Sequence, residues 1–494
     1  MRTRVRNDLP QAIVALLGAL ALIGNQGCES GPNYQQPTDV PANDWSRKPE
    51  GSLVSGQASL ERWWEGFHDP VLDQLLARVR DNNQDLAKAL ANVQVAYAKV
   101  GVSESQFWPA VGAGAQLSYL KQNASTLAAA GVELNPYSVY AWGAQASWEI
   151  DLWGKVARQV EAATASAESQ VDILREALVS LRAQAAANYM QVRMLQAELQ
   201  VTRDSIEVFT GLRDLVKAKL AAGTATILDL NRAQAQLDLA TTKLPSLENN
   251  LSSTQNTLAV LCGTTVGQIE PMLAQDQPIP TGPGQVGVGV PADLLRRRAD
   301  VRAAERELAA ATANIGAFEA LYLPQLAISG NWYLSAPTLG GLGSISNQNY
   351  SIGPSVSWLI FQGGYVQSLV WQSKAQMAAA LAGYRQSVLG AIADVERSMV
   401  ALNMSRVAEL SYDDAVANVE VAAGLARLQY AQGVTSLSNL LDVENQLLSV
   451  RSDQVQNEGL VAQNLVGLYR ALGGGWEESS INQEAETATK RPTT

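Results

Sequence analysis

Four segments of the chain alternate apolar residues with small or polar residues. A period of two places neighbouring side chains on opposite faces of a β-sheet, so each segment is predicted to be a strand with one apolar and one polar face. The apolar faces include Trp142, Trp332 and Trp358, whereas the polar faces carry mainly Ser, Gln, Asn and Gly. The predicted strands are 109–122, 137–150, 324–336 and 348–361.

These predicted strands are long enough to cross a membrane. Each has about 13 residues, which at ~3.3 Å per residue and a tilt of ~45° spans a hydrocarbon layer of ~30 Å. Trp and Tyr near the strand ends resemble the aromatic girdles of membrane barrels. A half-buried soluble sheet is the alternative, but its strands usually have only five or six residues. The pattern therefore favours transmembrane strands.

Four strands are too few to close a barrel around a lumen. An open sheet edge in lipid leaves backbone groups without hydrogen bonds, at a cost of several kcal/mol for each group. Two copies of the chain would give eight strands and a filled interior, and three copies would give twelve strands and an open pore. The sequence therefore predicts an oligomer, for which three copies is the most economical number.

Long helical hairpins follow each predicted strand pair. The stretch 156–222 contains no Pro and carries an apolar heptad seam, which predicts a helix of ~100 Å. A Gly-containing break and a second helix follow, and Pro245 is expected to bend that returning helix. The predicted hairpins are 156–261 and 366–472, and the shorter helices ahead of the strands are 70–107 and 291–322.

The chain contains an internal repeat. Residues 219–263 align without a gap onto 429–473, and the segments around the strands repeat as well. Two copies of a helix–strand–strand–hairpin unit predict a pseudo-twofold architecture and an α+β membrane protein. The predicted divisions are repeat 1 at 70–270, a Pro- and Gly-rich linker at 271–290, repeat 2 at 291–476 and a disordered tail at 477–494.

Composition narrows the function. The formal charge of -11 disfavours nucleic-acid binding, because phosphate neutralisation needs a basic surface. A single His leaves little scope for a metal centre, and none is predicted. No nucleophile–base pair, phosphate-binding loop or metal-ligand spacing is present, so the sequence gives no support for an enzyme.

The amino terminus has the features of an export signal. Basic residues precede an apolar run that is too short for a comfortable membrane span, which predicts a cleavable signal peptide over 1–27. Cys28 follows a small residue directly after this run, as in bacterial lipoproteins. We therefore predict a covalent lipid such as palmitate on Cys28, a lipid-anchored segment over 28–69 and no other bound cofactor. Ordinary signal cleavage with a free Cys28 thiol is the alternative.

Several motifs in a fixed order resemble the TolC-like outer-membrane efflux proteins, specifically the NodT-type lipoprotein branch that serves RND multidrug pumps. The resemblance covers roughly 30–476 of the chain. The motifs are Gly31-Pro32-Asn33-Tyr34, Trp63-Trp64, Trp148-Glu149-Ile150-Asp151-Leu152-Trp153-Gly154, Val290-Pro291-Ala292-Asp293-Leu294-Leu295 and Gly473-Gly474-Gly475-Trp476.

This resemblance implies a homotrimer in the outer membrane of a Gram-negative bacterium. Its twelve-stranded barrel would be continuous with a periplasmic α-helical barrel, and outer-membrane lipid would surround the strands. A periplasmic adaptor protein would bind the hairpin tips and link the channel to an inner-membrane RND transporter. By position, the docking residues are Gly223, Thr224, Ala225 and Thr226 in the first tip and Gly433, Val434, Thr435 and Ser436 in the second.

The resemblance also implies a periplasmic gate near the second tip. Asp442 falls on a family gate position, Asp229 is the nearby candidate in the first repeat, and Ser438 stands where a relative has Leu. Three symmetry-related carboxylates would repel one another or recruit cations. The alternative for both acids is a helix N-terminal residue that interacts favourably with the helix dipole.

Two functions remain at this point. The first is a passive, gated exit duct of a tripartite efflux system, and the second is a trimeric coiled-coil envelope protein or adhesin. The sequence does not indicate the exported substrate, because small polar lumen residues suit a non-selective conduit.

Overall fold

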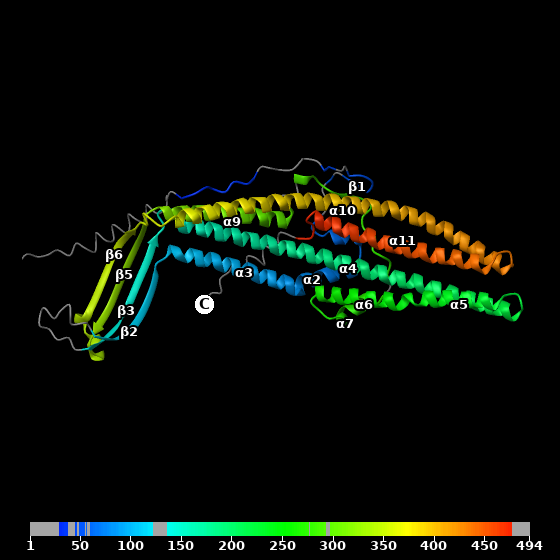
Figure 1. The fold of residues 1–494 in the computed structure, drawn as a ribbon, viewed down its shortest axis with the longest axis horizontal. Helices are drawn as coiled ribbons and strands as arrows, with labels where there is room; N and C mark the ends of the chain where they lie inside the picture. The colour runs from blue at the N-terminus through cyan, green and yellow to red at the C-terminus, as the bar shows by residue number, and fades with distance from the viewer. Residues whose placement is uncertain are drawn as a thin grey trace, which may run out of the picture. The chain divides into compact units, whose positions relative to one another are not determined.

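The computed structural model describes residues 29–37, 45–46, 49–54, 56, 60–121, 136–275, 277–292 and 297–476. The described chain is mostly helical, with one four-stranded sheet (Figure 1). It divides into two compact units. Unit 1 contains Gln94–Ser169 and Ala304–Tyr384 with the segment before Pro37, and unit 2 contains Pro37–Val93, Gln170–Ala303 and the chain from Arg385 onward.

Unit 1 is built on an antiparallel sheet whose strand order is β2-β3-β5-β6. The strands alternate in direction from one edge to the other. They are β2 (Ala110–Leu120), β3 (Tyr137–Ile150), β5 (Gln325–Ala336) and β6 (Gln348–Ser357). The turn of chain after each pair enters a long helix, as the sequence pattern predicts.

One strand is shorter than the sequence pattern predicts. The fourth segment alternates through residue 361, but β6 ends at Ser357. Trp358 and Ile360 therefore lie outside the sheet, where both side chains are exposed. The equivalent stretch of β3 stays in the sheet to Ile150, because it pairs with β5.

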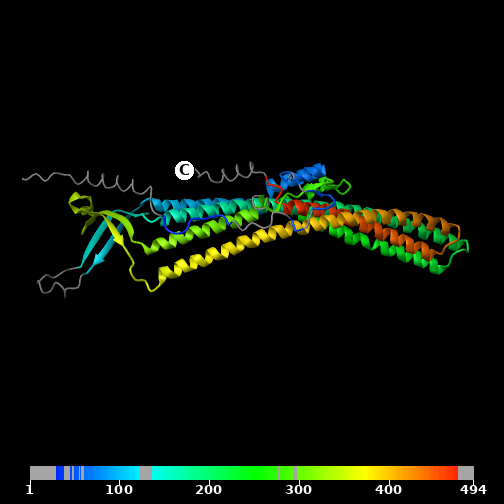
Figure 2. The same cartoon turned by 90° about the horizontal axis from the view of Figure 1, so that it is seen from above.

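Two helical hairpins supply most of unit 2 and extend into unit 1. They are α4 (Lys155–Ala221) with α5 (Ile227–Thr241) and α6 (Lys243–Leu261), and α10 (Tyr365–Ala431) with α11 (Leu437–Ala471). The first returning helix is interrupted at Thr242, within one turn of Pro245, whose missing N–H removes a helical hydrogen bond. The second returning helix is continuous through the equivalent Val455. The two hairpin turns lie side by side at one end of unit 2 (Figures 1 and 2).

Shorter elements precede the strands and join the repeats. The helix predicted over 70–107 is divided at Asn83, whose side-chain oxygen accepts hydrogen bonds from Asp85 N at 2.9 Å and Leu86 N at 3.0 Å and so caps a new helix. The elements are α2 (Pro70–Asn82), α3 (Gln84–Glu104), α7 (Val266–Leu273), α9 (Ala299–Glu319) and the paired short strands β1 (Leu53–Val54) and β4 (Val286–Gly287). Within the described ranges, no helix combines the length and apolarity needed to span a bilayer.

Unit 2 contains a cluster of aromatic and arginine side chains beside the start of α2. Trp63 stacks on Tyr469 with ring centroids 5.2 Å apart. The Arg182 guanidinium lies 4.7 Å from the Trp64 ring centroid, and Tyr189 donates a 2.5 Å hydrogen bond to Asp69, the N-cap of α2. These contacts fix the start of repeat 1 against the hairpins.

Candidate channel face, gate and docking turns

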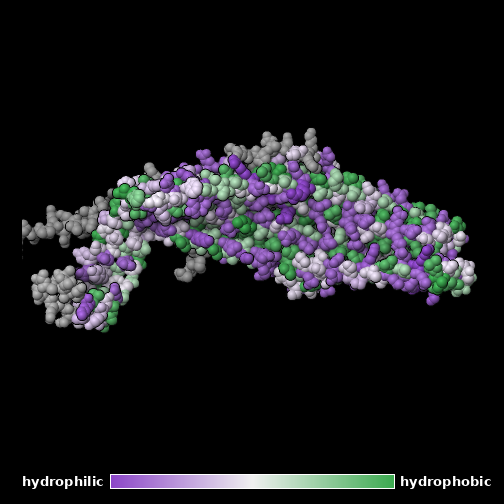
Figure 3. Space-filling model, viewed as in Figure 1, coloured by the Kyte–Doolittle hydropathy of each residue, from purple (hydrophilic) through white to green (hydrophobic). Residues whose placement is uncertain are grey.

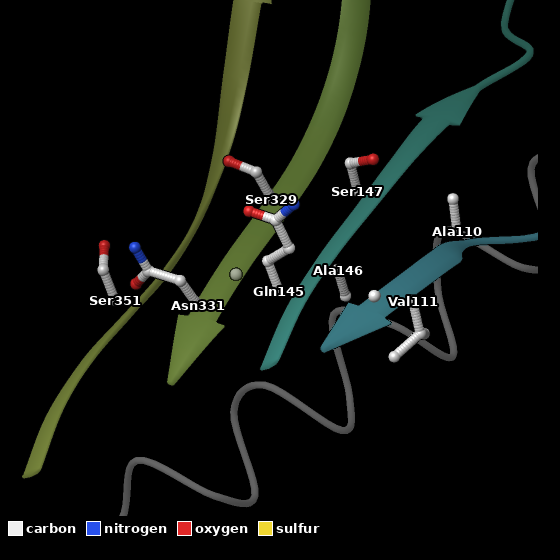
Figure 4. Close-up of a pocket in the computed structure, with 10 residues that line it drawn as sticks. Ala110, Val111, Gln145, Ala146, Ser147, Ser329, Asn331 and Ser351 are labelled. Carbon is white, nitrogen blue, oxygen red and sulfur yellow. The ribbon is translucent and has the colours of Figure 1, made fainter. Parts of the chain in front are cut away.

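One face of the sheet is polar across all four strands. Register places Gln145 opposite Gly112 on one side and Asn331 on the other, and Asn331 opposite Ser351. Figure 4 shows Gln145, Ser147, Ser329 and Asn331 projecting from the same side of the sheet, with Val111 pointing away from them. A hollow of about 490 Å³ opens over this face. Its polar lining consists of hydroxyl and amide groups.

The opposite face of the sheet is apolar and largely accessible to solvent. Trp142 and Trp332 meet edge to face, with ring centroids 5.4 Å apart, and Val111 and Ile352 lie in the same face. All four side chains are exposed to solvent in the single chain. Exposed apolar side chains that lie together on one face of a sheet mark a surface that contacts lipid or protein.

Each hairpin turn has the same backbone. In the first turn Gly223 has a φ of 74°, and Thr224 N donates to Lys219 O at 2.8 Å. In the second turn Gly433 has a φ of 77°, and Val434 N donates to Gln429 O at 2.8 Å. These are left-handed helix ends with the Schellman hydrogen-bond pattern, which strongly favours Gly.

The turns present both polar backbone and apolar side chains. Gly223, Gly433 and Val434 are exposed, and so are Ile227 and Leu228 just beyond the first turn. Figure 3 shows hydrophobic surface at this end of the hairpins. The predicted docking residues of both tips therefore lie together on an accessible surface of unit 2.

Asp229 has a structural role in the first turn. Thr226 is the N-cap of α5 and accepts a hydrogen bond from Asp229 N at 3.2 Å, while the Asp229 carboxylate accepts from Thr226 N at 3.0 Å and from the Thr226 hydroxyl at 2.7 Å. This reciprocal pattern is a capping box. Hydrogen bonds from the Thr226 hydroxyl and backbone hold the pKa of Asp229 below its usual value. The geometry thus favours the helix-terminal alternative for this residue.

Asp442 and Ser438, unlike Asp229, do not belong to a capping box. They are four residues apart on α11, so they share one exposed helix face, which Asn445 continues. Among the described residues, the Asp442 carboxylate has no hydrogen-bond or ion-pair partner. Its charge is therefore available to another molecule or another copy of the chain, as a gate requires.

A contact between the two turns was not predicted from the sequence. The Lys219 ammonium donates to Tyr430 O at 2.8 Å and lies 4.3 Å from the Tyr430 ring centroid. It therefore joins the end of α4 to the end of α10 by a charge-assisted hydrogen bond and a cation–π contact. Burial, and then the nearby Asp229 carboxylate, raise the pKa of Tyr430. A basic residue in the last turn of a helix was the only sequence signal.

A second missed contact ties α10 to α11 beneath the turn. Arg427 forms a two-point ion pair with the buried carboxylate of Glu444, with a distance of 2.7 Å from Nη2 to Oε2. The hydrogen bonds that Arg427 donates to Glu444 raise the pKa of Arg427. Because the Glu444 side chain is buried and that of Arg427 is about half exposed, removal of Arg427 is the costly change, since it leaves a buried carboxylate without its partner.

The predicted lipid site, Cys28, lies outside the described residues. The residues directly after it are packed against repeat 1 near the end of β3. Ser30 N donates to Trp153 O at 3.1 Å, and a side chain on Gly154 would meet the Glu29 backbone at 3.0 Å. No group of His, Cys, Asp and Glu suited to a metal occurs in the described part of the chain.

The polar sheet face, the long hairpins and the exposed turns fit the channel that the sequence predicts. The chain belongs to the outer membrane efflux protein family, which it matches over residues 75–264 and 290–474. The resemblance found in the sequence is therefore confirmed, and the chain is an outer-membrane efflux channel. The match favours the channel over the adhesin.

Individual relatives align with most of the chain. The pyoverdine export outer membrane protein OpmQ of Pseudomonas putida is 30% identical over 424 residues, which cover 85% of this chain and 89% of that protein. Nodulation protein T of Rhizobium leguminosarum is 28% identical over 465 residues, or 94% of each chain. The solved outer-membrane channel OprN superposes with a TM-score of 0.83 at 30% identity, covering 91% of this chain and all of that one.

Proposed function

We propose that three copies of the chain form a homotrimeric duct in which three four-stranded sheets close one transmembrane barrel of twelve strands. In this assembly the polar face of the sheet lines the lumen and the apolar face contacts lipid. The hairpins of the three copies form a helical tunnel in the periplasm. The observation that carries the proposal is a sheet with two chemically opposite faces, both exposed, in a chain of the outer membrane efflux protein family.

The strand directions support a ring of copies. Because neighbouring strands alternate in direction, the edge strands β2 and β6 run antiparallel to each other. A second copy therefore adds its β2 to β6 by rotation about an axis along the barrel, which is the head-to-tail arrangement that closes into a cyclic oligomer. Closure satisfies the edge backbone groups, as a bilayer demands.

We further propose that Cys28 carries a covalent lipid in the outer membrane. Glu29 and Ser30 pack beside Trp153 and Gly154 at the junction of the sheet with α4. In the proposed barrel this junction lies at the periplasmic rim of the bilayer. A lipid on the preceding residue would reach the inner leaflet there and add to the hold of the strands.

The hairpin turns are the proposed docking surface for a periplasmic adaptor, which joins the channel to an inner-membrane RND transporter. The exposed backbone at Gly223 and Gly433 and the exposed Val434 side chain support this assignment. The cargo is a small molecule, such as the pyoverdine in the name of the Pseudomonas putida relative. The transporter selects it, because hydroxyl and amide groups in the lumen give the channel little selectivity.

The gate is the proposed role of Asp442, with Ser438 on the same helix face. Purified protein in planar bilayers should show a small conductance, and Asp442→Ala should raise it about two- to tenfold by removing a ring of like charges. Asp229→Asn is the matched control, because it also neutralises an acid beside the turns, and it should leave conductance unchanged. An unaltered conductance in Asp442→Ala would remove Asp442 from the gate. No conductance in any variant, together with failure to restore efflux in cells, would overturn the channel assembly.

A further inference from the structure

The internal repeat preserves strand register to the residue. In the first strand pair Ala110 lies opposite Ser147, and their repeat equivalents Gln325 and Ser357 lie opposite each other in the second pair. At the other end of the ladders, Tyr119 lies opposite Ser138, and the equivalents Leu334 and Gln348 are again opposite. Residues that are equivalent in the repeat alignment therefore occupy equivalent positions in the strand ladders of the two repeats.

A different ladder joins one repeat to the next. β3 of repeat 1 pairs with β5 of repeat 2, with Ile150 opposite Leu326 and Trp148 opposite Ile328. The corresponding edge of repeat 2 is β6, and within the described ranges no strand covers it. If the repeat-to-repeat ladder is reproduced there, the missing partner is β2 of a second copy, because β2 is the repeat equivalent of β5.

From this template we infer that β6 pairs with β2 of a second copy in one specific register. Ile360 then lies opposite Val111, Trp358 opposite Ala113 and Ser355 opposite Gln116 of that copy. Residues 358–361 become a continuation of β6 on assembly. This inference rests on the proposed channel assembly and specifies the contact from which that assembly is built.

The inferred pairing explains why β6 is shorter than its counterpart. β2 covers β3 only as far as Ser147, and the last residues of β3 are paired by β5 alone. The equivalent residues Trp358, Leu359 and Ile360 have no such neighbour in the described chain and are 57%, 70% and 84% exposed. The alternation at residues 358–361 is thus a strand signal whose partner strand belongs to another copy.

The two faces of the sheet agree with this register. Ser355 and Gln116 are both on the polar face, and Ile352 and Tyr119, which would also lie opposite each other, are both on the apolar face. A slip of one residue would place Gln116 on the lipid side, so it is excluded by the pattern. A slip of two residues preserves the faces and is the competing arrangement.

Two cysteine pairs separate the inferred register from the slipped one. Leu359→Cys with Gly112→Cys tests the inferred pair, and Leu359→Cys with Gly114→Cys tests the slip of two. Both glycines have room for a side chain, since an added Cβ at Gly112 stays 3.9 Å from Gln145 and one at Gly114 meets no atom within 4 Å. Three strand spacings separate β2 from β6 within one sheet, roughly 14 Å, so a disulfide must join two copies.

Isolated outer membranes are oxidised and the covalent dimers and trimers are quantified on denaturing gels, with each single-cysteine variant as the background for the native thiols. Directly opposed residues have Cβ atoms about 5 Å apart and diagonal residues about 7–8 Å. We expect at least about tenfold more cross-linked chain for the Gly112 pair than for the Gly114 pair. Ser355→Cys with Gln116→Cys, against Ser355→Cys with Ser118→Cys, repeats the test inside the observed β6, because the same slip of two would place Ser355 opposite Ser118.

The outcomes also distinguish this inference from the proposed function. Stronger cross-linking of the slipped pairs, Leu359 with Gly114 and Ser355 with Ser118, would overturn the register and leave the channel intact. Cross-linking at Ser355 but not at Leu359 would overturn the extension of β6. No cross-linking in any pair, with efflux still restored by the same variants in cells, would overturn pairing of β6 with β2. Failure of the unmodified chain to restore efflux would count against the proposed function itself.

Discussion

The two repeats share a backbone plan but differ where the sheet joins the long helix. In repeat 1, Lys155 pairs with Glu149 at 2.5 Å and Asp151 accepts a hydrogen bond from Ala157 N at 2.8 Å. The repeat 2 equivalents of Glu149, Asp151 and Lys155 are Leu359, Phe361 and Tyr365, and all three are exposed. The first junction completes its polar contacts within the chain, whereas the second offers apolar groups to its surroundings.

The hairpin turns show the same division between framework and side chains. Gly223 and Gly433 share a positive φ and the same hydrogen bonds. On the exposed helix face beyond them, however, Arg232 in the first hairpin corresponds to Asp442 in the second. The two repeats thus share the backbone of the turn but carry opposite charges at this equivalent position. The comparison teaches that pseudo-twofold symmetry of the backbone does not extend to the chemistry of the tip.

The largest difference between the two hairpins is expected in the packing of their cores. Leu440 is 1% exposed in the cluster that joins both hairpins, whereas its equivalent Leu230 packs at the edge of that cluster and is only partly buried. Leu440→Ala should lower the free energy of local unfolding by about 2–5 kcal/mol and Leu230→Ala by about half of that or less. Hydrogen exchange of the hairpin amides in detergent measures both losses. Equal losses would show that the two leucines are equally buried in the assembled protein.

Loss of the Lys219–Tyr430 contact should have a smaller effect than Leu440→Ala, and one confined to the two hairpin turns. Lys219→Met keeps the apolar stem but removes the hydrogen bond and cation–π contact with Tyr430. We expect the free energy of opening at the turns to fall by about 1–2 kcal/mol, and exchange of the turn amides to accelerate about 5- to 30-fold.

The matched control is Gln429→Met, because Gln429 is the exposed repeat equivalent of Lys219. Its free energy of opening should change by less than about 0.5 kcal/mol. If both variants open the turns equally, the Lys219–Tyr430 contact is not what distinguishes the α4 end from the α10 end.

Much of the sheet follows from its sequence alone. The period of two assigns Gln145 and Trp142 to opposite faces, and the register places them there. The exception is the end of the fourth strand, where Trp358 continues the pattern but leaves the sheet. Alternation shows which face of a sheet a residue would occupy, but a strand also needs a neighbouring strand, and the described part of the chain does not supply one beside Trp358.

The contacts at the hairpin turns can be predicted from the sequence only in part. The spacing of Thr226 and Asp229 is a capping-box signal and could have identified the structural role of Asp229 in advance. The Lys219–Tyr430 contact could not, because a heptad seam shows which helix face is buried and not which helix covers it. The gate role of Asp442 stays a prediction, because among the described residues no group pairs with its carboxylate.

The smallest expected effect concerns the one titratable difference between the two caps, Asp229 in the first turn and Asn439 in the second. Because the folded state lowers the pKa of Asp229, its stabilisation is complete above the unfolded value of about 4 and is lost as the pH falls through the lower folded value. Protection of the Thr226 and Asp229 amides from exchange, corrected for the intrinsic rate, should therefore fall about two- to threefold below pH 4, while protection in the second turn stays constant.

Exchanging the side chains at positions 229 and 439 should transfer the pH dependence of amide exchange from the first turn to the second. Asp229→Asn should remove the pH dependence from the first turn. Asn439→Asp should create it in the second, where Ser436 already accepts a hydrogen bond from Asn439 N at 3.3 Å and a carboxylate could complete a capping box. A pH dependence that persists in Asp229→Asn would mean that another group in the tip titrates. Because the two turns share one backbone, the side chain at this position should then be sufficient to determine which of them responds to acid.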